Sequence, residues 1–175
     1  VGDPPHRPTR DDGYAAAHAA LTGEPDTRSG SVGAGCGATA GRLRGGFGQA
    51  SMQVGEWIMA AGIVANPMGD VMSPDTGEFW ADPRRKVAVD KLPAATPKLN
   101  TTIGVIATNA PITKAQAKRL AMVAHDGIAR AIHPAHSPLD GDTLFCLSTG
   151  DGTGVDLETM LSLSTHAAEI TAAAI

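Results

Sequence analysis

Apolar residues in the second half of the chain alternate between strand spacing and helix spacing. Residues 101–110 (TTIGVIATNA) are rich in β-branched side chains and predict a central strand. A capping-box pattern at residues 113–116 is followed by apolar residues at helical spacing up to Ile132, which predicts a helix. A second buried strand is expected over residues 142–149 and a closing helix over residues 155–175. The second half therefore follows the order strand, helix, strand, helix.

The first half predicts shorter elements. An alanine-rich helix is expected to end at Leu21, with Asp11 or Asp12 as its N-terminal cap. Two apolar runs of strand length, residues 48–54 and 57–66, are separated by a Gly-Glu pair. They predict a β-hairpin whose second strand is buried on both faces.

A glycine-rich run at residues 30–48 lies between this helix and the hairpin. It holds too much glycine for a regular element and is typical of backbone that takes positive φ or approaches another group closely. The run satisfies a G-x-G-x-x-A pattern, but no strand precedes it and the expected acidic residue is misplaced, so a dinucleotide site is not favoured. After the hairpin, residues 67–100 predict a long solvated loop.

Composition places the chain among folded domains of ordinary size. Its 175 residues match one domain, and 42% hydrophobic with 18% charged residues exclude a disordered chain or a charged coiled coil. The net charge of −4 argues against a nucleic-acid partner. No apolar stretch approaches the ~20 residues that span a bilayer, so we expect no membrane segment. Cys36 and Cys146 predict two reduced thiols in a cytoplasmic protein, with a single disulfide as the alternative.

The segment HPAHSPLDGD (residues 133–142) holds side chains of the types that bind divalent metals. His133, His136, Asp140 and Asp142 could be brought together by a turn. Against a metal site, a proline separates the two histidines, and Asp-Gly-Asp is ordinary turn chemistry. A metal-dependent hydrolase that uses these four residues is therefore the weaker hypothesis.

Asn100, Thr101 and Thr102 precede the strongest predicted strand. In isolation a threonine at this position reflects β-propensity alone. If the bond between Asn100 and Thr101 were cut, Thr101 would carry a free α-amine beside its hydroxyl, and one residue would supply both nucleophile and base. The reference pKa of an α-amine, about 7.7–8.0, already lies close to operating pH.

Four segments together resemble the L-aminopeptidase/D-esterase family of N-terminal-nucleophile hydrolases, which includes β-aminopeptidases and 6-aminohexanoate-oligomer (nylon oligomer) hydrolases. The resemblance implies an α/β fold, an αββα sandwich of layered sheets flanked by helices. It extends in family order from about Gly30 to the end of the chain. The segments are GSVGAGCGATAGRLRGGFGQAS (30–51), IVANPMGD (63–70), LNTTIGVIATNAPITKAQAKRLAMVAHDGIARAI (99–132) and HSPLDGDTLFCLSTG (136–150).

The resemblance also implies a precursor that cleaves itself into two associated chains. Thr101 falls where the family has its nucleophile, so cleavage would follow Asn100. Residues 1–175 would be a single domain and the C-terminal part of a longer precursor. Within it, residues 1–100 would end the α chain and residues 101–175 would form the β chain. The proline-rich start without an initiator methionine agrees with a longer gene product.

The same resemblance assigns expected roles to individual side chains. Asn66 matches a family active-site asparagine and is expected to bind the developing oxyanion. Asp140 and Asp142 match paired polar or acidic positions and would orient the Thr101 amine and hydroxyl and assist proton transfer. Arg42 stands where related nylon hydrolases carry a lysine; as a permanent cation it could stabilise charge but could not act as a proton shuttle.

The expected function is a self-processing N-terminal-threonine hydrolase, an aminopeptidase or amidohydrolase. It would cleave small peptide, amide or ester substrates through an acyl-enzyme on Thr101. The expected partners are this substrate, the chain's own cleaved α and β segments, and further copies in a homotetramer, without a cofactor or metal. A family active-site tyrosine has no counterpart here, because Tyr14 lies in a different context. The alternative is a catalytically silent family member that serves as a binding or assembly module.

Overall fold

A four-stranded sheet forms the centre of the protein. The structure is a computed structural model and describes residues 7–24, 26–94 and 100–175. The strand order is β3-β4-β5-β6; the first two pairs are antiparallel, and β5 and β6 are parallel. The bounds are β3 Gly46–Val54, β4 Trp57–Ala65, β5 Ile103–Thr108 and β6 Thr143–Ser148.

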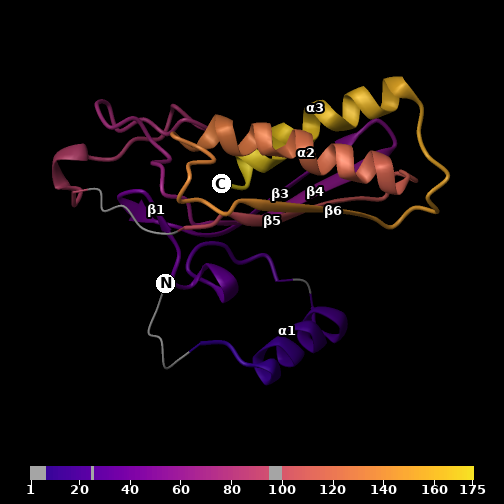
Figure 1. Cartoon of the computed structure of the whole chain (residues 1–175), viewed down its shortest axis with the longest axis horizontal. Helices are drawn as coiled ribbons and strands as arrows, with labels where there is room; N and C mark the ends of the chain where they lie inside the picture. Colours follow the sequence, from indigo (N-terminus) through magenta and orange to yellow (C-terminus); the bar gives the residue numbers. More distant parts are fainter. Residues whose placement is uncertain (1–6, 25, 95–99) are drawn as a thin grey trace.

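Two long helices cover one face of this sheet (Figure 1). Helix α2 (Lys114–Ala131) connects β5 to β6, as a parallel pair requires, and α3 (Leu157–Ala173) follows β6. The predicted capping box of α2 is present. Apolar side chains from the sheet and both helices meet in a core whose largest members are fully buried: Met59, Ile63, Ile106, Leu120, Ile128 and Leu163.

The two helices pack closely because α2 carries a glycine where they meet. A β-carbon at Gly127 would lie 2.3 Å from the backbone oxygen of Ala168 and 2.6 Å from the β-carbon of Thr171. Only glycine therefore fits at this crossing without separating α2 from α3.

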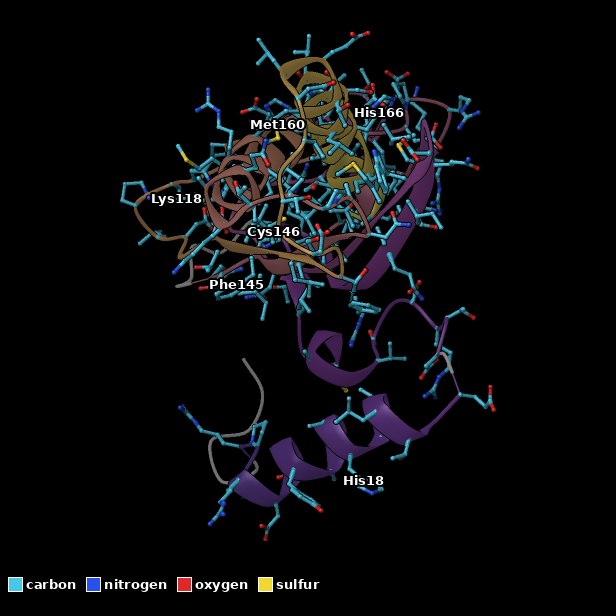
Figure 2. All side chains as sticks on the ribbon, turned by 90° about the vertical axis from the view of Figure 1, so that its right-hand side faces the viewer. His18, Lys118, Phe145, Cys146, Met160 and His166 are labelled. Carbon is cyan, nitrogen blue, oxygen red and sulfur yellow. The ribbon has the colours of Figure 1, made fainter. Side chains whose placement is uncertain are left out.

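The opposite face of the sheet is apolar and partly open among the described residues. Phe145 points away from the helices, whereas its neighbour Cys146 points toward them (Figure 2). Phe145 is 66% exposed, Leu147 47% and Ile58 55%. The expectations that β4 is buried on both faces and that β6 is a buried strand are therefore wrong for the described residues, because α2 and α3 both pack on the opposite face.

Helix α1 (Arg10–Thr22) lies on the other side of the sheet from α2 and α3, and none of its residues is buried (Figure 1). Its N-terminal cap is Thr9 rather than Asp11 or Asp12. The Thr9 hydroxyl accepts from the Asp12 backbone N–H at 3.4 Å, and the Asp12 carboxylate accepts from the Thr9 N–H at 2.7 Å. The reciprocal pair satisfies free N–H groups at the helix start.

The glycine-rich run and the long loop hold only short elements. The run contains a single 3₁₀ turn, η2, and the two-stranded pair β1-β2, while the loop contains the 3₁₀ turn η3 and isolated bridges. Among the helices that the structure describes, none is long and apolar enough to cross a membrane. The bounds are η2 Gly33–Gly35, β1 Thr39–Ala40, β2 Leu43–Arg44 and η3 Val89–Lys91.

Candidate active site

Three strand ends meet at one edge of the sheet and carry the predicted site residues. Strand β4 is antiparallel to β5, and β6 is parallel to β5, so the end of β4 lies beside the starts of β5 and β6. Asn66 directly follows β4, Thr101 comes two residues before β5, and Asp142 directly precedes β6. A bridge between Asn100 and Asp140 extends the pairing of β5 with β6. The fold thus gathers residues that are far apart in the sequence.

Thr101 is half-buried at this edge and is held by its backbone. Its N–H donates to the Asn66 backbone oxygen at 3.0 Å, which extends the β4–β5 pairing by one bond. Its hydroxyl donates to the carbonyl oxygen of Asn100 at 2.6 Å. The nucleophile predicted from the sequence therefore lies directly beside the peptide bond that it would attack.

The carbonyl oxygen of Asn100 accepts a second hydrogen bond, from the Gly141 backbone N–H at 3.1 Å. The Gly141 N–H is the donor that remains on this oxygen when the Thr101 hydroxyl gives up its proton, and it would stabilise negative charge there. Gly141 was not singled out by the sequence analysis. Its position between the two aspartates of Asp-Gly-Asp could have indicated this role, but that motif is also typical of an ordinary turn.

Asn100 is held by hydrogen bonds from both its backbone and its side chain, and it is only 6% exposed. Its N–H donates to Leu139 O at 3.0 Å, and its side-chain Nδ2 donates to Pro67 O at 2.8 Å. Within the described part of the chain, the buried oxygens Asn100 Oδ1 and Thr102 Oγ1 have no hydrogen-bond partner.

The two aspartates bind backbone groups that flank the site. Asp142 Oδ1 accepts from the Thr102 N–H at 2.9 Å. Asp140 Oδ1 accepts from the Met68 N–H at 2.9 Å, and its Oδ2 accepts from the Ser137 hydroxyl at 2.7 Å. Neither carboxylate forms a hydrogen bond with Thr101 in the intact chain. Both instead hold the segments on either side of Thr101 in place.

The Asn66 side chain is oriented by the glycine-rich run. Its Oδ1 accepts from the backbone N–H of Thr39 in β1 at 3.0 Å. Because the carbonyl oxygen of the amide is occupied, the NH₂ group is the end that remains to donate to another oxygen. This orientation is the one that an oxyanion donor requires.

Arg42 pairs with Asp70, a residue the sequence analysis missed as a partner although it closes the matched segment 63–70. The Arg42 backbone N–H donates to Asp70 Oδ1 at 2.9 Å, and its Nε donates to Oδ2 at 3.3 Å. Both side chains are largely buried, 14% and 19% exposed. Asp70 in turn exchanges backbone hydrogen bonds with His133. The Arg42 guanidinium is therefore paired with the Asp70 carboxylate, and no hydrogen bond joins Arg42 to Thr101.

The structure brings only two of the four residues of the metal hypothesis, His136 and Asp142, into contact. The His133 ring packs edge-on against Trp80 at a centroid distance of 4.7 Å, and His136 pairs with Asp142 through Nδ1 and Oδ2 at 2.8 Å. The Asp140 carboxylate accepts hydrogen bonds from Met68 and Ser137. Across the described ranges, no group of three or more His, Cys, Asp or Glu side chains is placed to hold a metal ion.

A cavity of about 580 Å³ lies beside the glycine-rich run. It is lined by β2 and the first half of β3, by the end of α3, and by Ala65 at the end of β4. Thr101 does not line this cavity. Ala65, which directly precedes Asn66, is the lining residue that comes nearest to the candidate site along the chain.

Comparison with known proteins agrees with the geometry. An aminopeptidase of Mycobacterium leprae, itself named as uncharacterized, is 43% identical over 168 residues, covering 86% of this chain and 46% of that protein. A 6-aminohexanoate-oligomer endohydrolase of a Kocuria species is 32% identical over 166 residues, covering 84% of this chain and 45% of that protein. The chain thus spans about half the length of these curated relatives.

Among solved structures, the L-aminopeptidase D-Ala-esterase/amidase of Ochrobactrum anthropi aligns with a TM-score of 0.66 at 25% identity, covering 88% of this chain and 44% of that one. It is described as a variant of the N-terminal-nucleophile hydrolase fold, so the α/β fold expected from the resemblance is confirmed. The family model of peptidase family S58 matches residues 3–175. Since this match covers nearly the whole chain, the protein belongs to peptidase family S58.

Proposed function

We propose that this chain is the catalytic part of a self-processing N-terminal-threonine hydrolase with Thr101 as its nucleophile. One observation carries the proposal: the Thr101 hydroxyl lies 2.6 Å from the carbonyl oxygen of Asn100, and that oxygen also accepts the Gly141 N–H at 3.1 Å. The nucleophile, the bond to be broken and a donor to the developing oxyanion are thus in one place.

Self-cleavage would proceed by an N-to-O acyl shift. The Thr101 Oγ attacks the carbonyl carbon of Asn100, and the hydroxyl proton passes to the Thr101 nitrogen. The C–N bond then breaks, leaving Asn100 as an ester on Oγ and Thr101 with a free amine. Water hydrolyses this ester, which gives a carboxylate on Asn100 and restores the hydroxyl. Residues 1–100 then end the α chain, and residues 101–175 form the β chain.

In turnover, the freed α-amine of Thr101 would accept the proton of its own hydroxyl, because its reference pKa of about 7.7–8.0 is close to neutral pH. The hydroxyl oxygen attacks the substrate carbonyl, the leaving amine or alcohol takes the proton, and water releases the acyl group. Asn66 would donate from Nδ2 to the oxyanion, since its Oδ1 is held by Thr39. Asp140 and Asp142 fix the flanking segments, and Arg42 supports the neighbouring loop through Asp70.

The names of the relatives support a substrate with a peptide, amide or ester bond. We further propose that the walls of the substrate pocket come partly from segments outside residues 1–175, and that the working enzyme is a homotetramer of cleaved α and β segments. A cytoplasmic location is proposed because Cys36 and Cys146 are both free thiols.

Intact-mass spectrometry of the purified full-length protein tests the proposal. Two fragments whose masses place the break between Asn100 and Thr101 are expected from the wild type, and one uncleaved chain from Thr101→Ala. Thr101→Ser keeps a hydroxyl and should still cleave, and Thr153→Ala, at an exposed turn, is the matched control. A wild-type chain that stays intact, or a Thr101→Ala chain that is still cut, contradicts the mechanism and favours a silent binding module.

A hydrolysis screen of α-aminoacyl, β-aminoacyl and aminohexanoyl amides then identifies the substrate class. Asn66→Asp keeps the oxygen that Thr39 binds but loses the donor, so kcat should fall by about 10²–10³-fold. A kcat that is unchanged in Asn66→Asp would remove Asn66 from the oxyanion site. Activity should be insensitive to chelators, whereas a metalloenzyme would lose it.

A further inference from the structure

His136 has an unusual backbone conformation at the margin of the candidate site. Its φ of 53° makes it the one residue besides glycines in the described part of the chain with a left-handed backbone. Residues other than glycine adopt this region where the surrounding structure holds them in it, and histidine, like asparagine and aspartate, does so more often than most. Such residues are common at functional sites.

The conformation directs the His136 ring to Asp142. Nδ1 of His136 and Oδ2 of Asp142 are 2.8 Å apart, and the Asp142 side chain is only 4% exposed. Because a carboxylate can only accept, Nδ1 carries the hydrogen. The second oxygen of the same carboxylate, Oδ1, holds the Thr102 N–H at 2.9 Å. His136 thus fixes one end of a buried carboxylate whose other end fixes the residue after Thr101.

A second histidine supports the ring from α2. The His125 ring lies 5.0 Å from the His136 ring, centroid to centroid, at an interplanar angle of 53°. Burial, and then the charge of His136, lower the pKa of His125, while Asp142 and Asp126 oppose the shift. The neutral form of His125 is therefore favoured.

We propose that His136 is a positioning residue, which acts through Asp142 to hold the Thr101–Thr102 segment in the geometry needed for attack. This inference rests on the proposed function of Thr101. No metal or direct contact with the reacting atoms is involved. The specific requirement is a hydrogen-bond donor at the position of Nδ1.

Two substitutions separate the donor from the backbone. Asparagine and glycine both tolerate a left-handed φ, so neither variant is strained at this position. Asparagine places its Nδ2 near the position of Nδ1 and can still donate to Asp142, whereas glycine cannot. His136→Gly should therefore slow self-cleavage and lower kcat by about 10- to 100-fold, the effect of losing a hydrogen bond to a charged group. His136→Asn should recover most of both rates.

The measurements are the rate of self-cleavage of newly synthesised full-length protein, followed by intact mass, and kcat and KM of the cleaved enzyme. A positioning role predicts a lower kcat at similar KM at a temperature where every variant is fully folded, and a loss of activity larger than any loss of folded protein in His136→Gly explains. The matched controls are His166→Asn on α3 and His18→Gly on α1 (Figure 2). Neither helix carries a residue assigned to the site, so both variants should behave as wild type.

The inference is overturned if His136→Gly cleaves and turns over like the wild type, if His136→Asn is as slow as His136→Gly, or if activity falls only in step with melting temperature. Thr101→Ala, measured in parallel, distinguishes the two levels of the argument. If Thr101→Ala still cleaves, the proposed function fails and this inference fails with it. If Thr101→Ala is inert while His136→Gly is normal, only the role of His136 is rejected.

Discussion

The backbone of Gly141 lies directly against the hydroxyl of Thr101. A β-carbon at Gly141 would come within 2.9 Å of Thr101 Oγ1, a separation that real β-carbons essentially never show. The same glycine donates its N–H to the Asn100 carbonyl oxygen. The residue between the two aspartates is therefore constrained by the nucleophile and not only by the turn.

Gly141→Ala should displace the Thr101 hydroxyl and slow self-cleavage by about 10²-fold, because small misplacements of a reacting group have effects of this size. The rate is measured by intact mass over time. Gly13→Ala is the matched control: a β-carbon at Gly13 in α1 meets nothing within 4 Å, so cleavage should be normal. Equal rates in both variants would show that the contact with Thr101 does not constrain the reaction.

The ion pair between Arg42 and Asp70 should be stronger than an exposed pair. A double-mutant cycle with Arg42→Ala and Asp70→Ala is expected to give a coupling energy of about 1–3 kcal/mol in denaturant unfolding, because both side chains are largely buried. The pair of Lys86 and Glu78, 58% and 45% exposed, should give about 0–1 kcal/mol. A coupling energy near zero for the first pair would contradict the geometry.

We expect Phe145 to behave as a core residue in the full-length protein, because the αββα sandwich that the family resemblance implies would place a second sheet on the open face. Phe145→Ala is then expected to lower the free energy of unfolding of the full-length protein by about 3–5 kcal/mol. Met122→Ala, at a 54% exposed position on α2, should change it by no more than about 0.5 kcal/mol. Similar small effects for both would mean that nothing covers Phe145.

Cys146 should be much less reactive than Cys36. Burial raises the pKa of the Cys146 thiol to about 11, whereas Cys36 is exposed. Iodoacetamide at pH 8 should therefore label Cys36 first, as peptide mass spectrometry can show.

The raised pKa of Cys146 also predicts a loss of stability at alkaline pH. An unfolded thiol ionises near pH 8.5, so the contribution of Cys146 is complete below that value. It is lost as pH rises toward about 11, because the unfolded state releases its proton first. Unfolding free energies of wild type and Cys146→Ala should converge over this range; parallel curves would contradict the burial of the thiol.

Elements with strong local signals were predictable from the sequence. The hairpin turn at Gly55 and the capping box at Thr113 are found where the pattern puts them, since each depends on a few neighbouring residues. The cap of α1 was misassigned to Asp11 or Asp12 because Asp12 takes part in the motif from its third helical position, while Thr9 supplies the cap. The exposure of one face of β6 was missed because periodicity does not reveal whether a second layer covers a strand.

The candidate site was predictable as a set of residues but not as a set of contacts. Thr101 drew attention because a free N-terminal threonine supplies both nucleophile and base, and the family resemblance placed the nucleophile there, added Asn66 and gave Asp140 and Asp142 a role other than metal binding. The pairing of Asp142 with His136 depends on a left-handed backbone that no pattern indicated. Contacts of this kind join residues through side-chain rotamers and backbone angles, which spacing along the chain does not encode.

Strand β5 lies between a strand that precedes residue 100 and a strand that follows it. It pairs along its full length with β4 on one side and with β6 on the other, and α3 also packs on β3 and β4. A cut after Asn100 therefore breaks one covalent bond but none of the hydrogen bonds between the strands of the sheet. The two pieces would behave as a single molecule in native electrophoresis and as two in denaturant, and the cut would turn the interior of one domain into a permanent subunit interface.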